Sequence, residues 1–196
     1  MTLANKIILN RQIVTDSWQF VGENQALPAS GNLIVPLAVW REQQITLTQR
    51  AGKTGVWLKG SDHPEQLQSN NAPIELPLIA VEFPQFVDGR GYSIGRLLRE
   101  RYGFKGELRA IGDVLRDQLS ALTRCGFNSF ALKEGKSLDD ALKAFDDFSD
   151  AYQNAVDQPP PYYRRRLDAH PATEATKATK ATEATKANLA TASAAA

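Results

Sequence analysis

The chain has 196 residues, of which 42% are hydrophobic and 23% are charged, so it is long enough to bury a sizeable core. Its 23 Lys and Arg residues against 22 Asp and Glu residues give a net charge of +1, which excludes a broad basic surface for nucleic acid. No apolar run reaches membrane-spanning length, and the start of the chain shows no secretory signal. The single cysteine, Cys125, cannot form an internal disulfide, which fits a reducing compartment, so we expect a cytoplasmic protein. From the neutral charge and the short apolar runs we expect no nucleic-acid or membrane partner.

The first third of the chain holds short apolar runs separated by turn residues. The elements predicted here are a β-hairpin of residues 6–9 and 12–21 around Asn10 and Arg11, strands at 32–35 and 55–58, and a helix at 37–48 between those two strands.

From residue 76 to residue 154, strands and amphipathic helices alternate in a βαβαβα pattern. The strands are predicted at 76–83, 107–111 and 127–132, and the helices at 93–102, 114–125 and 138–154. Asp113 is the expected N-cap of the second helix, and Ser137 with Asp140 is a capping pair for the third. This alternation implies parallel strands joined by right-handed crossovers. We therefore predict an α/β domain with an open, mostly parallel sheet of about five strands, too few for a closed eight-stranded barrel.

The composition changes after the last predicted helix. Three prolines at 159–161 end that helix, and two tyrosines and three arginines follow them. From residue 171 the chain consists of Ala-Thr repeats with Lys or Glu, whose side chains cannot offset the entropy of ordering. We predict a single α/β domain at 1–158, a Pro/Tyr/Arg linker at 159–170 and a disordered tail at 171–196.

Ligands of open α/β sheets bind at the loops after the strands, where backbone N–H groups at helix N-termini are exposed. The loop after the strand at 76–83 combines glycines, a guanidinium group and a hydroxyl, which favours a site for a small anion. The predicted site residues are Asp88, Gly89, Arg90, Gly91, Tyr92, Ser93, Arg109 and Asp113. The glycine spacing is one residue longer than the dinucleotide fingerprint. In the alternative interpretation the glycines form a tight turn, Asp88 bonds to its backbone and Ser93 caps the helix.

Two charged residues, Glu82 and Arg109, lie within predicted central strands. Burying either charge alone is costly, so a structural Glu82–Arg109 pair is expected if their strands are neighbours. The alternative is a polar site that faces the strand ends. Cys125, near a helix C-terminus, is either a redox residue or part of the core. No histidine or cysteine spacing predicts a metal site.

Five stretches of this sequence, taken together, resemble a bacterial family of unknown function. They are EFPQFVDGRGYS (82–93), RLLRER (96–101), GELRAIGD (106–113), LRDQ (115–118) and RCGF (124–127). Members of that family are often labelled as oxidoreductases involved in sulfite reduction and are encoded beside assimilatory sulfate and sulfite reduction genes. The resemblance extends more loosely from the N-terminus to about residue 166 and leaves out the tail. It implies a role in sulfur assimilation in the company of sulfite reductase, but supplies no catalytic residues.

The leading hypothesis is an accessory protein of assimilatory sulfate or sulfite reduction that binds a small anion or a partner reductase through residues 88–93. One alternative is a free-standing small oxidoreductase with a flavin or nicotinamide cofactor, and another is a structural adaptor for sulfite reductase. Sulfite reduction to sulfide needs a cofactor that carries several electrons, and one cysteine cannot ligate a sirohaem-coupled cluster. The chain is therefore not expected to be the sirohaem and iron–sulfur reductase itself.

Overall fold

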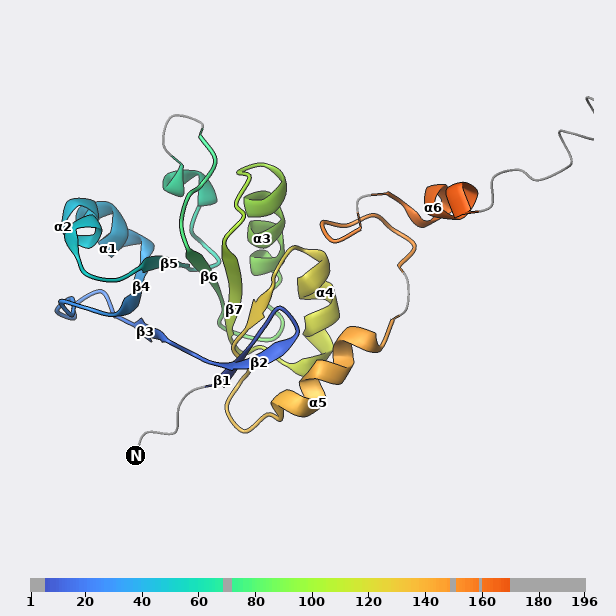
Figure 1. The fold of residues 1–196 in the computed structure, drawn as a ribbon, viewed down its shortest axis with the longest axis horizontal. Helices are drawn as coiled ribbons and strands as arrows, with labels where there is room; N and C mark the ends of the chain where they lie inside the picture. The colour runs from blue at the N-terminus through green and yellow to red at the C-terminus, as the bar shows by residue number, and fades with distance from the viewer. Residues whose placement is uncertain (1–5, 69–71, 149–150, 159, 170–196) are drawn as a thin grey trace, which may run out of the picture. The chain divides into compact units, whose positions relative to one another are not determined.

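Figure 1 shows the computed structural model of the chain, which describes residues 6–68, 72–148, 151–158 and 160–169. The described residues form two compact units, one within residues 6–148 and 155–158, the other within residues 151–154 and 160–169. The tail predicted to be disordered, residues 171–196, lies outside the described residues. Within the described ranges, no helix is both long enough and apolar enough to cross a membrane.

An eight-stranded sheet forms the centre of the first unit, with the strand order β2-β1-β8-β7-β6-β5-β4-β3. Its strands are β1 (Lys6–Leu9), β2 (Gln12–Thr15), β3 (Trp18–Phe20), β4 (Asn32–Pro36), β5 (Thr54–Leu58), β6 (Leu78–Phe83), β7 (Glu107–Gly112) and β8 (Ser129–Phe130). Strands β3 to β8 are parallel and follow one another across the sheet in chain order. Strand β1 is antiparallel to both β8 and β2. The sheet curls into half a barrel (Figure 1).

The predicted α/β class and N-terminal hairpin are confirmed, but the predicted count of about five strands is wrong. The hairpin turn has positive φ at Asn10 (49°) and Arg11 (62°), as a two-residue turn between twisted strands requires. The strand predicted at 12–21 is split at Asp16 and Ser17 into β2 and β3, which lie at opposite edges of the sheet. Strand β3 is therefore a sixth parallel strand, and both strands of the hairpin join the same sheet.

The strand order contains no reversal, so each crossover carries the chain to the next strand in the same direction. Right-handed crossovers of this kind place the helices on one face of the sheet, as in closed α/β barrels. Doubly wound sheets instead reverse direction once and bind ligands at that switch point. This sheet has no switch point, and the carboxyl ends of β3 to β8 lie together at one end of the half-barrel.

The helices cover the convex face of the first unit. They are α1 (Leu37–Glu42), α2 (Gln44–Gln49), α3 (Arg90–Glu100), α4 (Leu119–Arg124) and α5 (Leu138–Lys143), with the 3₁₀ turns η1 (Pro64–Leu67), η2 (Arg116–Gln118) and η3 (Ala144–Asp146). The helix predicted at 37–48 is interrupted at Gln43. Ser137 Oγ accepts a hydrogen bond from Asp140 N at 3.2 Å, which confirms the predicted cap of α5. That helix does not continue toward residue 154, because Phe148 is exposed and the apolar spacing beyond η3 meets no core.

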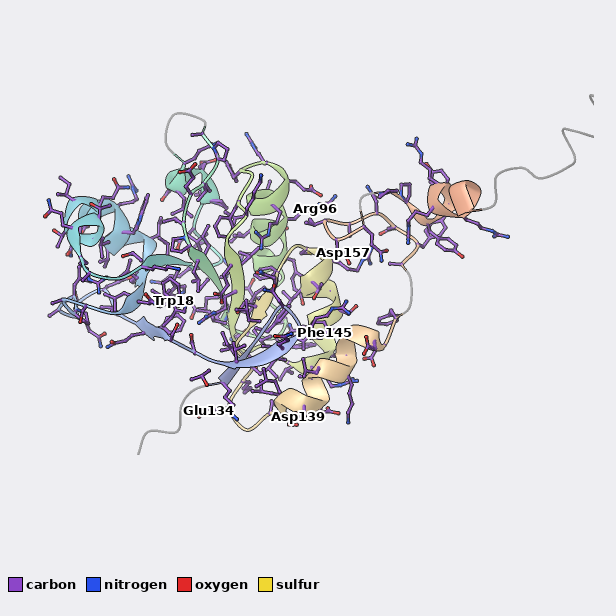
Figure 2. All side chains as sticks on the ribbon, viewed as in Figure 1. Trp18, Arg96, Glu134, Asp139, Phe145 and Asp157 are labelled. Atoms are coloured by element: carbon purple, nitrogen blue, oxygen red, sulfur yellow. The ribbon has the colours of Figure 1, made fainter. Side chains whose placement is uncertain are left out.

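Strand β6 is buried on both faces, which accounts for its continuous apolar sequence. Ile79, Val81 and Phe83 pack in the main cluster beneath the helices. Leu78 and Ala80 pack in a second cluster on the concave face, against which Trp18, labelled in Figure 2, also packs. The core therefore has two layers, one on each side of the sheet.

The second unit contains α6 (Tyr162–Ala169), a helix in the region predicted to be a linker. The helix starts directly after Pro161, whose carbonyl accepts a hydrogen bond from Arg164 N at 3.0 Å. Because proline has no N–H to lose at a helix start, Pro161 is well suited to the position directly before α6. Within this unit Tyr162 N donates to Tyr152 O at 3.2 Å.

Candidate functional site

The carboxyl ends of β5, β6 and β7 lie next to one another, because these neighbouring strands are parallel. The loops that follow them are residues 59–62, 84–89 and 113–115. In α/β barrels the functional residues come from loops at this end. We call these loops, together with Glu82 and Arg90, the carboxyl-end surface.

Hydrogen bonds hold the loop of residues 84–89 in place. Asp88 N donates to Gln85 O at 3.0 Å within the loop. From outside the loop, Gln118 donates through Nε2 to Phe86 O at 3.3 Å. These bonds fix both halves of the loop, so its shape is a defined feature of the surface.

Asp113, predicted as a helix N-cap, instead connects this loop to the segment after β8. Its carboxylate accepts a hydrogen bond from the Phe86 N–H, and its Oδ1 lies 2.9 Å from Lys133 Nζ. Lys133, chiefly through its bond to the carboxylate, lowers the pKa of Asp113. Helix α4 starts only at Leu119, after η2, so the side chain of Asp113 is free for this role.

Arg90 and Asp88 form a close ion pair at the start of α3. Arg90 Nη2 lies 2.6 Å from Asp88 Oδ2, and Arg90 Nε lies 3.0 Å from Oδ1. Asp88 Oδ1 also accepts a hydrogen bond from Arg90 N at 3.1 Å, which is the side-chain to backbone bond of the predicted tight turn. The Arg90 guanidinium lowers the pKa of Asp88 to about 2. The cation of the predicted anion site is therefore already paired within its own loop.

The glycines of the loop have packing roles that differ from one another. A Cβ on Gly91 would lie 2.5 Å from the ring of Phe83, whereas a Cβ on Gly89 would meet nothing within 4 Å. Gly91 therefore lets α3 approach the sheet closely. Tyr92 packs edge-to-face on the same phenyl ring, with ring centroids 5.4 Å apart. Ser93 is inside the helix, which begins at Arg90 with no side-chain cap.

The structure does not form the expected Glu82–Arg109 pair, although β6 and β7 are neighbours. Arg109 is aligned with Ala80, two residues before Glu82, and its side chain is fully buried on the concave face. Its Nη1 lies 2.8 Å from Asp16 Oδ2, and its Nη2 lies 2.7 Å from Glu107 Oε1. Arg109 therefore ties the short link between β2 and β3 to the centre of the sheet.

Glu82 is left near the carboxyl end of β6, half buried. Within the described residues its carboxylate makes no hydrogen bond or ion pair. Its charge acts on Lys59, whose pKa is raised chiefly by Glu23 and more weakly by Asp62 and Glu82. Lys59 Nζ bonds to Glu23 Oε1 at 2.8 Å and lies 5.7 Å from the centre of the Trp57 ring.

Lys59 also lines a small cavity at the carboxyl ends of β4 and β5, of about 150 Å³. Its charged lining residues are Glu23, Arg41, Lys59 and Asp62. The sequence did not lead us to predict a site at these four charged residues. Lys59 directly follows the predicted strand at 55–58, so the same rule that selected residues 88–93 would have found it.

The remaining predicted site residue is Cys125, the C-terminal cap of α4. Burial, above all, raises the pKa of its thiol, which disfavours the reactive thiolate. Among the described residues, no three His, Cys, Asp or Glu side chains gather in a group that could hold a metal ion.

Two large apolar side chains are exposed on the fixed loop. Phe86 is 45% exposed and Val87 is 82% exposed. They directly precede Asp88 in the chain, so the loop presents apolar and charged groups next to one another. The site as a whole is a surface of hydrogen-bonded loops at the carboxyl end of an α/β half-barrel.

Residues 55–163 match the family described as "Bacterial protein of unknown function (DUF934)". The match covers more than half of the chain, so the chain belongs to this family. It includes β5 without its first residue, β6 to β8, and the carboxyl-end loops 59–62, 84–89 and 113–115. No curated protein and no solved structure matches the chain. The predicted bacterial family of unknown function is thus confirmed, and the link to sulfite reduction stays a prediction.

Proposed function

We propose that this protein is an accessory protein of assimilatory sulfate or sulfite reduction that docks a partner enzyme on the loop of residues 84–89. The pathway and sulfite reductase as the partner come from the family resemblance. The docking loop rests on one observation: Phe86 and Val87 are exposed on a loop that hydrogen bonds hold fixed.

A rigid loop with exposed apolar side chains is well suited to binding. The exposed parts of such side chains contribute nothing to the folded monomer, but they gain free energy when a partner covers them. Because the loop is already ordered, association costs little conformational entropy. The Asp88–Arg90 pair beside them supplies charges of both signs that can fix the partner's orientation.

The test measures binding of the purified protein to purified sulfite reductase from the same bacterium by biolayer interferometry. We expect saturable binding that Phe86→Ser and Val87→Ser each weaken by about tenfold or more, as anchor residues do. The matched control is Ile45→Ser, because Ile45 is 75% exposed on α2, away from the loop. No binding by the unmodified protein, or equal binding by the loop variants, would contradict the proposal.

Binding of a small anion is a second candidate, favoured by the position of two cations. A Cβ on Gly60 would lie 3.0 Å from Arg90 Nε, so Arg90 lies against the turn that follows Lys59. The two side chains come from different loops and border the same turn. Each is paired with a carboxylate, so an anion has to compete with Asp88 and Glu23.

Calorimetric titration with sulfite and sulfate tests this candidate. We expect binding that Lys59→Ala and Arg90→Ala both abolish, while Arg96→Ala on the exposed face of α3 leaves it unchanged. Binding heat that is unchanged in the Lys59 and Arg90 variants would mean that the anion does not bind at the carboxyl-end surface.

A further inference from the structure

The crossover between β5 and β6 differs from its neighbours in the helical layer. Helices α1 and α2 lie between β4 and β5, and α3 lies between β6 and β7. Between β5 and β6 the only helical element in the described residues is the 3₁₀ turn η1. The outer layer is therefore thinner at this point than on either side.

A cavity of about 630 Å³ lies at this thin point. One wall comes from α1 and α2 and includes Trp40 and Leu47, and the other comes from the crossover and includes Leu67 and Ile74. Trp40 packs against both the main cluster and the cluster beneath α1 and α2, so the cavity lies where these two clusters meet. Thr54, the first residue of β5, also lines it, which places the cavity at the end of the sheet opposite the carboxyl-end surface.

The lining of the cavity defines the chemistry of its ligand. The walls are mostly apolar, and the only charged side chain among the described lining residues is that of Glu75. Glu75 makes no hydrogen bond or ion pair with another described residue. A negatively charged ligand would be repelled here, and an apolar body would be covered by Trp40, Leu47 and Ile74.

We propose that this cavity binds a small organic molecule with an aromatic or aliphatic body that is neutral or positively charged, with its donor group at Glu75. The volume falls within the range of ligand pockets, about 300–1,000 Å³, and such pockets combine apolar walls with a few polar groups. The site is separate from the docking loop, so its occupation does not depend on the proposed function.

The test uses two fluorescent probes with one ring system and different charge. N-phenyl-1-naphthylamine is neutral, and 1-anilinonaphthalene-8-sulfonate is its negatively charged sulfonate. We expect the neutral probe to bind more tightly and to receive excitation energy from Trp40, so that Trp40→Phe reduces the transfer more than Trp18→Phe does. Glu75→Gln should tighten binding of the sulfonate by about threefold, as removal of one like charge near a surface implies, and leave the neutral probe unchanged.

Two variants fill the cavity from its exposed rim and should weaken binding of the neutral probe by about tenfold or more, because the ligand's volume is taken. These variants are Ala72→Phe and Thr48→Phe. If one of them fails to fold, the other still tests the proposal. The control is Ala121→Phe on the exposed side of α4. Three results would each overturn the proposal: no saturable binding of the neutral probe, equal binding by both filling variants, or tighter binding of the sulfonate by the unmodified protein.

Discussion

Two arginines of the predicted site, Arg109 and Arg90, have opposite surroundings. Arg109 is fully buried on the concave face and pairs with two carboxylates, those of Asp16 and Glu107. Arg90 lies on the carboxyl-end surface with its side chain 60% exposed, and among the described residues its one ion pair is with Asp88. A buried pair must be kept intact because each unpaired charge would be costly, whereas an exposed pair can open at little cost.

The comparison separates structural charges from charges that are available to a ligand or partner. Arg109 is bonded to a residue 93 positions away in the chain and joins the β2–β3 link to β7. Arg90 is bonded to a residue two positions away, so its pair shapes only the start of α3. Arg90 is therefore the arginine that is accessible to a ligand or partner, whereas Arg109 holds parts of the sheet together.

Replacement of Arg109 should have the largest effect on stability. Arg109→Met leaves Asp16 and Glu107 as buried carboxylates without a cation, so we expect the free energy of unfolding to fall by about 3–5 kcal/mol. Urea denaturation followed by circular dichroism measures this change. Arg96→Met is the control, because Arg96 pairs with Glu100 on the exposed face of α3 and should change the midpoint little. Equal midpoints for the two variants would mean that the buried cluster does not hold the sheet together.

The two glycines beside Arg90 give an effect of intermediate size. Gly91→Ala places a methyl group against Phe83, so overpacking should lower the free energy of unfolding by about 1–3 kcal/mol. Gly89→Ala meets open space and should stay within about 0.5 kcal/mol of the unmodified protein. Denaturation of both variants under the same conditions compares them. A larger loss at Gly89 would show that the loop, and not the contact of α3 with the sheet, requires glycine.

Local patterns in the sequence predicted the kind and order of most elements of the α/β unit but not their ends, because apolar period and capping residues act over a few positions. The alternation from β6 to β8 and the Ser137 cap of α5 follow from such patterns. The number and order of the strands in the sheet were harder to predict from the sequence. Strand β3 has three residues and β8 has two, and strands this short are defined by their neighbours in the sheet rather than by their own sequence.

Only part of the candidate site could be predicted from the sequence: the local features were found, and the contacts between distant residues were not. Residues 88–93 were selected from their composition and their place after a strand, and they span the end of the loop after β6 and the start of α3. The partner of Arg109 was missed because Asp16 is remote in sequence, and nothing local distinguishes it from a turn residue. Exposure of Phe86 and Val87 could not be predicted either, since it depends on how the loop is anchored by Gln118.

The smallest expected effect is the pH dependence of the Asp88–Arg90 pair. The folded pKa of Asp88 is about 2, below its ordinary value of 3.8, because Arg90 bonds to the charged carboxylate. A lowered folded pKa means that the pair stabilises the protein fully above about pH 4 and loses this contribution as the pH falls from there through 2. Carboxyl-carbon NMR titration should give this low pKa for Asp88, and Arg90→Ala should raise it toward 3.8. An unshifted pKa in the unmodified protein would mean that the pair is open in solution, which would leave Arg90 free for an anion and reverse the order of the two candidate functions.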